Sequence, residues 1–557
     1  MKPNLYILNS IEEFEDCKNE ITKDDQIIYT SELLGLQLKK IGCEFSYESL
    51  FKHLTVDEVN KIKYDCLDRC YEISQKLDSD LANDLKKEFG HSFSVYGPFV
   101  NYSSVIIATV QILRKIIDFK KEYFNECILY DRKLANFFDS GSYLSDLLCS
   151  SYLNYRELKL TSNYKNDYWF KDYFKFKNFI RLYDLIKWRL FILKNNFFNY
   201  DFDEHYFIRP LYDSKEYLRD ISKNTKLIDF IFLLNKFKSS EVNLCFEINA
   251  DVLKKEIYSK YFTNLSRNIN NKKKDLFGRL RSLIKFLENK KVHALSWGNS
   301  PCQFSEKSVL ISALQQKYNV FGFQHGGSYV DQIYPFHYHS DFMRCTSYYS
   351  YSFLKSDLSL YKKEMCDIQV IPFGKKDIIS KKKIDKNEIL YVPTNSLNLY
   401  QGSILRSLPN GLLNVQLEIL KKLNNLDIKK LKPNVKPFPG ATIDSSFFLL
   451  EINKYKNLNY ILNASLKDYF KNRVPGLVIF DLPSTPIYEI LSTKAQVILY
   501  LDSVNPFTEE ALNLLRKRVY ICYSMDQIIK YIERYTSNNL EYKYNNEYYT
   551  RFVNSRV

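Results

Sequence analysis

The sequence predicts an α/β protein made of two domains with parallel sheets. Short apolar stretches that suit buried strands alternate with amphipathic stretches of helical period. The alternation recurs in both halves of the 557 residues, a length that suits about three average domains or two large ones. Repeated units of strand, loop and helix are typical of parallel sheets, so two Rossmann-like domains that face a cleft are the simplest arrangement.

The first domain is expected over residues 1–375. Its strands are predicted at 4–9, 26–31, 43–48, 127–132, 242–250, 292–299, 319–323, 342–350 and 368–374. Its helices are predicted at 32–42, 57–77, 104–124 and 275–290. Between about 140 and 240 the strand pattern is lost and wide apolar faces recur at helical spacing, which predicts a helical insertion.

The second domain is expected over residues 376–557, after a lysine-rich linker at its start. Its strands are predicted at 388–394, 434–439, 477–481, 496–502 and 519–524. Helices are predicted between and after them at 411–423, 446–455, 485–494, 507–518 and 525–535. Ligands of such sheets bind at the carboxyl ends of the strands, so the loops that follow the strands are searched first.

The net charge of +15 favours anionic partners such as phosphorylated substrates or anionic membrane surfaces. The basic residues are spread out and no nucleic-acid-binding signature is present, so we expect no nucleic acid partner. The eleven cysteines lack paired spacing, which predicts free thiols in a reducing cytoplasm and no zinc site. No stretch reaches the roughly 20 apolar residues of a membrane span, and the N-terminus does not resemble a signal peptide. We therefore expect a cytoplasmic protein, and peripheral contact with the inner face of a membrane stays open.

Four of the seven histidines fall between 293 and 339, and His325 lies in the turn Gln324-His325-Gly326-Gly327 directly after a predicted strand. The two glycines permit positive φ angles and close approach of the backbone to a ligand. The spacing of the histidines does not favour a metal site, because His337 and His339 lack a second pair of ligands. His325 is thus a candidate phosphate or sugar contact, or a catalytic acid or base.

Two further loops follow strands of the second domain. Ser484 and Thr485 begin a predicted helix after a buried strand, where they are either ordinary helix caps or ligands of a phosphate. Glu489 lies one turn further and could accept hydrogen bonds from a ribose. Lys436 enters a Pro-x-Pro-Gly loop, where it is either a lysine in a rigid turn or a cation held over a diphosphate or carboxylate.

The motifs Q-H-G-G-x-Y, K-P-x-P and D-x-x-S-T-x-x-x-E, in this order, resemble GT-B-fold glycosyltransferases of bacterial surface polysaccharide synthesis. The most similar groups are the Kdo transferases of capsule and lipopolysaccharide O-antigen assembly, which use CMP-activated ulosonic acids, and surface-carbohydrate transferases that carry QHGG-Y. The sequence departs from the capsule-type pattern at Phe438, where histidine is common. The motifs lie within 319–520, although the two-domain resemblance covers most of the chain.

The resemblance implies a nucleotide-sugar donor, CMP-linked by preference, and a glycan or lipid-linked glycan acceptor. It places the donor on the second domain, with Lys436 at the phosphate or carboxylate, Ser484 and Thr485 at the phosphate, and Glu489 at the ribose. Gln324, His325, Gly326 and Gly327 would line the cleft near the transferred sugar.

In addition to His325, the candidates for the base or nucleophile are Asp131 and Glu247, which lie at predicted strand ends. Each of these two carboxylates could instead have a purely structural role. No metal-binding DxD motif stands out in the sequence, so we expect neither metal nor cofactor. Two other functions stay open: transfer of a polyol phosphate from a CDP-linked donor, and glycan binding without catalysis.

Overall fold

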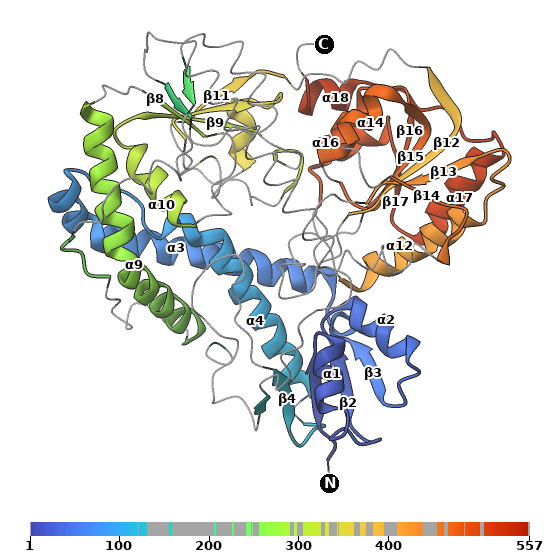
Figure 1. Ribbon diagram of the computed structural model, residues 1–557, viewed down its shortest axis with the longest axis horizontal. Coiled ribbons are helices and arrows are strands. Elements are labelled where there is room, and N and C mark those ends of the chain that lie inside the picture. The colour runs from blue at the N-terminus through green and yellow to red at the C-terminus, as the bar shows by residue number, and fades with distance from the viewer. Residues whose placement is uncertain are drawn as a thin grey trace.

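The computed structural model of the chain contains three parallel sheets that form three lobes (Figure 1). The structure describes residues 2–120, 122–130, 147, 155–158, 205–207, 225–227, 241–246, 248, 256–289, 294–297, 305–324, 329–333, 342, 345–360, 368–374, 383–394, 409–437, 454–461, 466–483, 485–501 and 506–554.

The N-terminal lobe is built on a five-stranded sheet of order β3-β2-β1-β4-β5. Its strands are β1 (Leu5–Leu8), β2 (Gln26–Tyr29), β3 (Ser46–Ser49), β4 (Cys127–Tyr130) and β5 (Tyr155–Leu158). One face of the sheet packs on α1 (Ile11–Cys17) and α2 (Glu32–Lys40) through a small apolar cluster. Ser10 caps α1 because its hydroxyl accepts the Glu13 N–H, which explains why the helix begins there.

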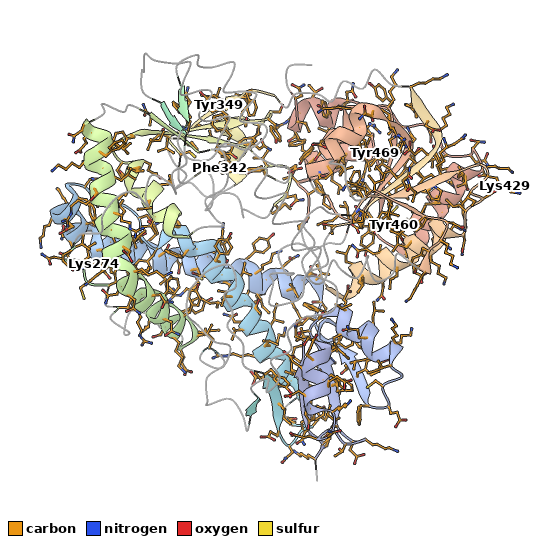
Figure 2. The ribbon with its side chains drawn as sticks, viewed as in Figure 1. Lys274, Phe342, Tyr349, Lys429, Tyr460 and Tyr469 are labelled. Atoms are coloured by element: carbon orange, nitrogen blue, oxygen red, sulfur yellow. The ribbon has the colours of Figure 1, made fainter. Side chains whose placement is uncertain are left out.

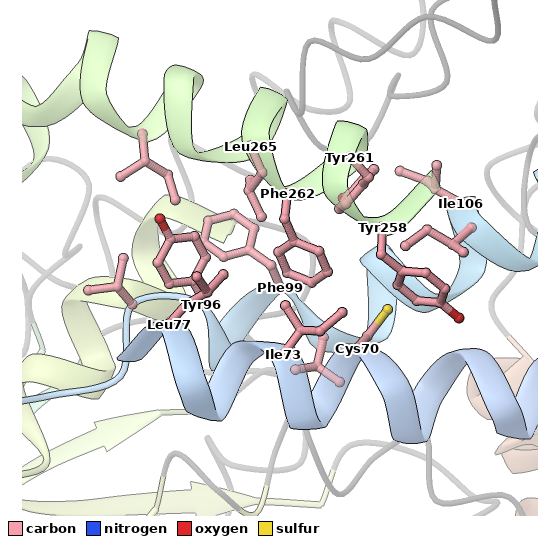
Figure 3. Packing of buried hydrophobic residues seen from close by; sticks show 14 of the residues in the cluster. Cys70, Ile73, Leu77, Tyr96, Phe99, Ile106, Tyr258, Tyr261, Phe262 and Leu265 are labelled. Atoms are coloured by element: carbon pink, nitrogen blue, oxygen red, sulfur yellow. The ribbon is translucent and has the colours of Figure 1, made fainter. Parts of the chain in front are cut away.

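A layer of long helices covers the other face of this sheet and also one face of the next sheet. It contains α3 (Val56–Phe89), α4 (Val100–Lys120), α9 (Glu256–Asn289) and α10 (Ser305–Leu314), with the short turns η1 (Leu50–His53) and η2 (Gly97–Phe99). Figure 3 shows α3, α4 and α9 with aromatic and aliphatic side chains interlocked between them. Buried strand residues of both sheets, such as Leu129 and Val320, belong to the same cluster, so the helices bind two sheets at once.

Residues Gly97–Lys120, which include α4, are long and apolar enough to cross a membrane, with a mean hydropathy of 1.2 in the most apolar window. They are the one such helix in the described part of the chain. However, 78% of that window is buried inside the protein, as expected for a helix at the centre of a core. The expectation that no stretch approaches the length of a membrane span is therefore wrong for Gly97–Lys120. The helix α4 within it packs against α3 and α9 in the core.

The middle lobe is built on a six-stranded sheet of order β11-β10-β9-β8-β6-β7. Its strands are β6 (His205–Phe207), β7 (Thr225–Leu227), β8 (Ala294–Trp297), β9 (Asn319–Phe323), β10 (Ser347–Ser350) and β11 (Gln369–Pro372), and the turn η7 spans Lys355–Leu360.

The C-terminal lobe is built on a six-stranded sheet of order β14-β13-β12-β15-β16-β17. Its strands are β12 (Ile384–Val392), β13 (Lys432–Val435), β14 (Asn459–Tyr460), β15 (Val474–Phe480), β16 (Gln496–Tyr500) and β17 (Tyr520–Cys522). Its helices are α12 (Pro409–Asn424), α14 (Leu466–Asn472), α15 (Thr485–Leu491), α16 (Glu509–Arg516), α17 (Met525–Thr536) and α18 (Glu547–Phe552). Helices α12 and α17 cover one face, and α14, α15, α16 and α18 cover the other.

The lobes are joined by shared cores. A second large cluster runs from the middle lobe into the C-terminal lobe and includes Phe342 on one side and Tyr469 on the other, both labelled in Figure 2. The C-terminal lobe also meets the N-terminal lobe, because the Leu413 N–H of α12 donates to a carboxylate oxygen of Glu32 in α2 at 2.8 Å. Each lobe therefore contacts both of the others, which makes the arrangement a closed ring.

The predicted class, α/β with parallel sheets, is confirmed. Two details are corrected. The range of the predicted helical insertion contains β5, β6 and β7, so the first half of the chain carries two sheets, not one. These strands have three or four residues each, which is too short for a period of two to show in the sequence.

The strand predicted at 242–250 is also wrong for the described residues 241–246, which are extended but belong to no sheet. Val242, Leu244 and Phe246 are buried because they pack on the helical layer, and Phe246 stacks on Phe277 of α9 with ring centroids 5.2 Å apart. Alternating burial against a helix therefore imitated the pattern of a half-buried strand.

We predict that Gly476→Ala destabilises the C-terminal lobe by about 1–3 kcal/mol. Gly476 lies in β15 at the point where the pairing with β12 shifts its register. A Cβ added there would lie 1.9 Å from Tyr535 Oη and 2.8 Å from Lys386 Cα. Adding Tyr535→Phe should restore only part of the stability, because the contact with the backbone of Lys386 stays. Urea denaturation of the two single variants and the double variant checks this, and a Gly476→Ala protein as stable as the wild type would contradict it.

A candidate ligand site at the carboxyl edge of the C-terminal sheet

The C-terminal sheet has one topological switch point, between β12 and β15. From β12 the chain proceeds to β13 and β14 on one side, and β15, β16 and β17 then add on the other side. Open parallel sheets bind ligands outside the carboxyl ends of the strands at such a point, because the loops diverge there and leave room. The two predicted site segments of this lobe follow β13 and β15, on either side of β12, so the topology brings them to the same edge.

Asp481 is the first residue after β15, and its carboxylate crosses the switch point. Oδ1 accepts the Thr394 N–H at 2.8 Å, beyond the end of β12. Oδ2 accepts the Tyr391 hydroxyl at 2.8 Å and the Gln416 amide of α12 at 2.6 Å. The carboxylate therefore ties together β12, β15 and α12.

Burial raises the pKa of Asp481 to about 6, and the hydrogen bonds from Gln416, Thr394 and Tyr391 oppose that rise. The same burial and the neighbouring carboxylate hold the pKa of Tyr391 well above its usual range, so the phenol remains a donor. Gln416 also donates to the Thr394 carbonyl at 3.0 Å, whereas its own amide oxygen has no hydrogen-bond partner among the described residues. A buried amide oxygen left in this way is suited to accept a hydrogen bond from a ligand or from Asp481 in its protonated form.

Lys436 is the first residue after β13, on the other side of β12. Its side chain is buried, with 1% of the residue exposed, and its backbone N–H donates to the Tyr391 carbonyl at 2.8 Å. The ammonium donates to the Pro437 carbonyl at 3.1 Å, and no carboxylate lies within ion-pair distance among the described residues. Burial alone lowers the pKa of Lys436. A buried amine that lacks a counter-ion is suited to bind an anion, because the anion would offset the cost of its desolvation.

The remaining predicted residues of this lobe lie around α15. Thr485 is the first residue of α15, and Glu489 is half-buried within that helix. Ser484 lies outside the described residues. No described atom shows what Thr485 binds, so the phosphate and ribose roles of these residues stay predictions.

Gln324 follows β9 in the middle lobe and is buried. Its N–H donates to the Tyr349 carbonyl at 2.9 Å, and its side-chain oxygen accepts the Tyr351 N–H at 2.7 Å. Gln324 therefore links the ends of β9 and β10, a structural task that occupies its amide oxygen. His325, Gly326, Gly327, Asp131 and Glu247 lie outside the described residues, as do 395–408 and 438–453, which include most of the helix predicted at 446–455.

No group of three His, Cys, Asp or Glu side chains that could hold a metal ion occurs in the described part of the chain. The described cysteines are free thiols, and burial raises the pKa of Cys17, Cys127 and Cys522 to about 12. These three thiols are therefore poor nucleophiles and poor metal ligands.

The sequence pattern did not single out Asp481 or Gln416 as site residues. Asp481 is a polar residue at the end of an apolar strand and the first residue of the D-x-x-S-T-x-x-x-E motif, so the sequence could have marked it as a candidate. Gln416 lies within an ordinary amphipathic helix, 65 positions from Asp481, and nothing in its local pattern marks it.

No protein-family model matches the sequence, and no curated protein matches it significantly. Part of the fold is similar to solved structures. A variant of S. aureus TarM in complex with UDP has 12% identity and a TM-score of 0.31, with 47% of this chain and 52% of that chain covered. The UDP-GlcNAc 2-epimerase from Methanocaldococcus jannaschii has 13% identity and a TM-score of 0.34, with 62% and 96% covered. S. aureus MnaA with UDP has 9% identity and a TM-score of 0.36, with 62% and 93% covered. The chain thus spans about half the length of TarM, and likeness of this degree assigns neither a family nor a function.

We predict that Asp481 makes the protein less stable as the pH rises. Because its pKa is raised in the folded state, its contribution to the free energy of unfolding is full below about pH 4 and is lost as the pH passes about 6. The total change is about 3 kcal/mol at most. Asp481→Asn should therefore become more stable relative to the wild type between pH 4 and pH 7.5, as measured by urea denaturation. The control Asp427→Asn alters an exposed carboxylate of the same lobe and should show a smaller trend; equal trends would refute the assignment.

Proposed function

We propose that the chain is a glycosyltransferase of the GT-B type that binds a nucleotide-activated sugar at the carboxyl edge of the C-terminal sheet. The single observation that carries the proposal is Lys436, a buried cation without a carboxylate partner in the described part of the chain, beside the switch point of a parallel sheet. Phosphate or carboxylate is the chemistry that such a site recognises. The order of the motifs supports a transferase as the bearer of this site.

The finer identity of the substrates is part of the same proposal. We propose a CMP-linked ulosonic acid as donor, because its carboxylate and phosphate would both suit Lys436, and a glycan or lipid-linked glycan of the cell surface as acceptor. The net charge of +15 favours such anionic ligands and favours peripheral association with the cytoplasmic face of a membrane. Ser484, Thr485 and Glu489 are proposed to contact the donor.

The catalytic roles belong to the other two lobes in this proposal. His325, in the loop after β9, is the proposed acid or base near the transferred sugar. Asp131 follows β4, which lies beside β1 at the switch point of the N-terminal sheet, so that strand end is where the topology would place a ligand-facing carboxylate. Glu247 follows the extended segment packed on α9 and is the alternative base. The chemistry asked of them is activation of an acceptor hydroxyl or attack on the sugar.

A polyol-phosphate transferase with a CDP-linked donor would use the same anion site, since Lys436 recognises phosphate whatever is transferred. The products differ in their bond. A glycosidic bond supports the glycosyltransferase, whereas a phosphodiester supports the alternative, and mass spectrometry of the product distinguishes them.

We predict that Lys436→Met weakens nucleotide binding at least tenfold while leaving the protein as stable as the wild type or more stable. Methionine keeps an apolar stem of similar length and removes a buried charge that has no carboxylate partner in the described part of the chain, so only the ligand should miss the ammonium. Calorimetry with CMP, CDP, UDP and GDP measures affinity, and thermal denaturation measures stability.

Lys429→Met, on the exposed surface of the same lobe (Figure 2), is the matched control and should change neither quantity. If none of the four nucleotides binds the wild type, the donor assignment is wrong. If one binds and Lys436→Met binds it equally well, the nucleotide lies elsewhere.

A further inference from the structure

The contact between the middle and C-terminal lobes contains a short backbone pairing. Gln332 of the middle lobe forms an antiparallel bridge with Phe507 of the C-terminal lobe. The Ile333 N–H donates to the Pro506 carbonyl at 2.9 Å, and the Thr508 N–H donates to the Asp331 carbonyl at 2.8 Å. Residues 331–333 and 506–508 therefore form a short antiparallel backbone pairing between the two lobes.

The side chain of Asp331 adds buried contacts between the same two lobes. The residue is 3% exposed, and Oδ2 accepts the hydroxyl of Tyr548 in α18 at 2.8 Å and the hydroxyl of Tyr488 in α15. The two tyrosine rings lie nearly parallel, with centroids 6.4 Å apart. Oδ1 has no hydrogen-bond partner among the described residues.

A carboxylate in this place is costly, because burial disfavours its charge and no described cation offsets it. An apolar side chain of similar size would remove this charge, but it would leave the buried hydroxyls of Tyr488 and Tyr548 without an acceptor, which is itself destabilising unless the tyrosines are changed as well. One oxygen of the carboxylate nevertheless accepts hydrogen bonds from two helices of the opposite lobe, and this fixes the orientation of Asp331 relative to both helices. Burial of this kind suits a residue that fixes geometry more than one that adds stability.

The neighbouring contacts between the same lobes are different in kind. Arg551 of α18 forms a bidentate pair with Asp357 at 3.1 and 2.5 Å and also donates to Glu510, but its side chain is 29% exposed. The Ser352 hydroxyl donates to the Thr550 carbonyl at 2.8 Å. The ion pair is partly buried, with the Asp357 side chain 14% exposed, and Ser352 is buried, so these contacts also hold the lobes together. Asp331 differs from them because one carboxylate oxygen joins the middle lobe to two helices of the C-terminal lobe.

The position of Asp331 in the sequence gives this contact a consequence. Asp331 lies four residues after Gly327 of the histidine-containing turn, and Tyr488 lies three residues after Thr485 and next to Glu489. One hydrogen bond thus joins the segment that carries the proposed acid or base to the helix that carries the proposed donor contacts.

We propose that Asp331 is a positioning residue that holds residues 331–333, which follow β9 in the chain, in register with α15 by accepting the hydroxyls of Tyr488 and Tyr548. The local geometry stands independently of the proposed function, whereas its value for transfer rests on that function. Asp331 touches no substrate in this proposal and acts only through the two tyrosines.

The test separates positioning from stability. The triple variant Asp331→Leu/Tyr488→Phe/Tyr548→Phe removes the carboxylate together with both hydroxyls, so no buried donor is left without its acceptor and thermal stability should be unchanged or higher. Amide hydrogen exchange of segments 329–333 and 506–512 should nevertheless increase at least tenfold, while exchange in α9 should stay as in the wild type. Asp331→Asn, which keeps one acceptor oxygen, should give an intermediate increase, and Asp331→Leu alone should increase exchange in the same segments and also lower thermal stability.

Tyr542→Phe is the matched control, because it removes a hydroxyl that donates to the Lys494 carbonyl at 2.7 Å within the C-terminal lobe alone. It should leave exchange at 329–333 unchanged. Wild-type exchange at 329–333 in the triple variant would overturn the proposal, and so would faster exchange throughout the chain in that variant, which indicates general destabilisation. Hydrogen exchange needs no substrate, so this result can fail or succeed apart from the nucleotide-binding test of Lys436.

Discussion

The hydrophobic cluster shared by the middle and C-terminal lobes is the constraint on which the remaining geometry depends. It takes side chains such as Phe342 and Tyr348 from one lobe and Phe480 and Leu499 from the other. Separating these lobes would expose apolar surface to water, which costs about 25 cal/mol of free energy per Å². The lobes therefore behave as one body unless another interaction offsets that cost. The helical layer of α3, α4 and α9 imposes the same condition on the N-terminal and middle lobes. No hydrophobic cluster of the described residues contains side chains of both α2 and α12, and these two helices are joined by the hydrogen bond from the Leu413 N–H to Glu32.

Several charged side chains are buried in the described part of the chain, and some of them have only neutral partners. Asp331 accepts from two phenols, and Asp481 accepts from a phenol, an amide and a backbone N–H. Neutral donors orient a carboxylate without cancelling its charge, so both groups keep raised pKa values. Lys436 and Arg518 are buried cations in a similar condition, since each donates to a backbone carbonyl and forms no ion pair among the described residues. Charges left uncancelled in this way are more typical of functional positions than of ordinary cores.

Local patterns predicted most strands well, because each strand of the C-terminal sheet is a short apolar run bounded by loop formers. The predicted strand at 477–481 corresponds to β15, and that at 496–502 corresponds to β16. Prediction failed where a segment is too short to show a period, as in β6, or where a helix and not a strand supplies the apolar partner, as for Phe246. Pairs such as Gln416 with Asp481 or Asp331 with Tyr548 were beyond prediction, because their meaning lies in contacts between residues far apart in the chain. Lys436 and Gln324 were named as candidates because they follow strands, and their roles at a site stay predictions; the structure shows that Gln324 joins two strand ends.

The placement of opposite charges on the two sides of β12 restricts where an anion can bind. Lys436 follows β13 and Asp481 follows β15, so β12 lies between them and the two backbones are about 10 Å apart, or two strand spacings. An anion on the β15 side would meet the carboxylate of Asp481, whereas one on the β13 side would meet only the ammonium. Above about pH 6, where Asp481 is ionised, electrostatics therefore favours the β13 side for the most negative part of a ligand. Helix α15, which follows Asp481, would then contact a neutral part of the same molecule, and this suits the predicted ribose role of Glu489 better than the predicted phosphate role of Thr485.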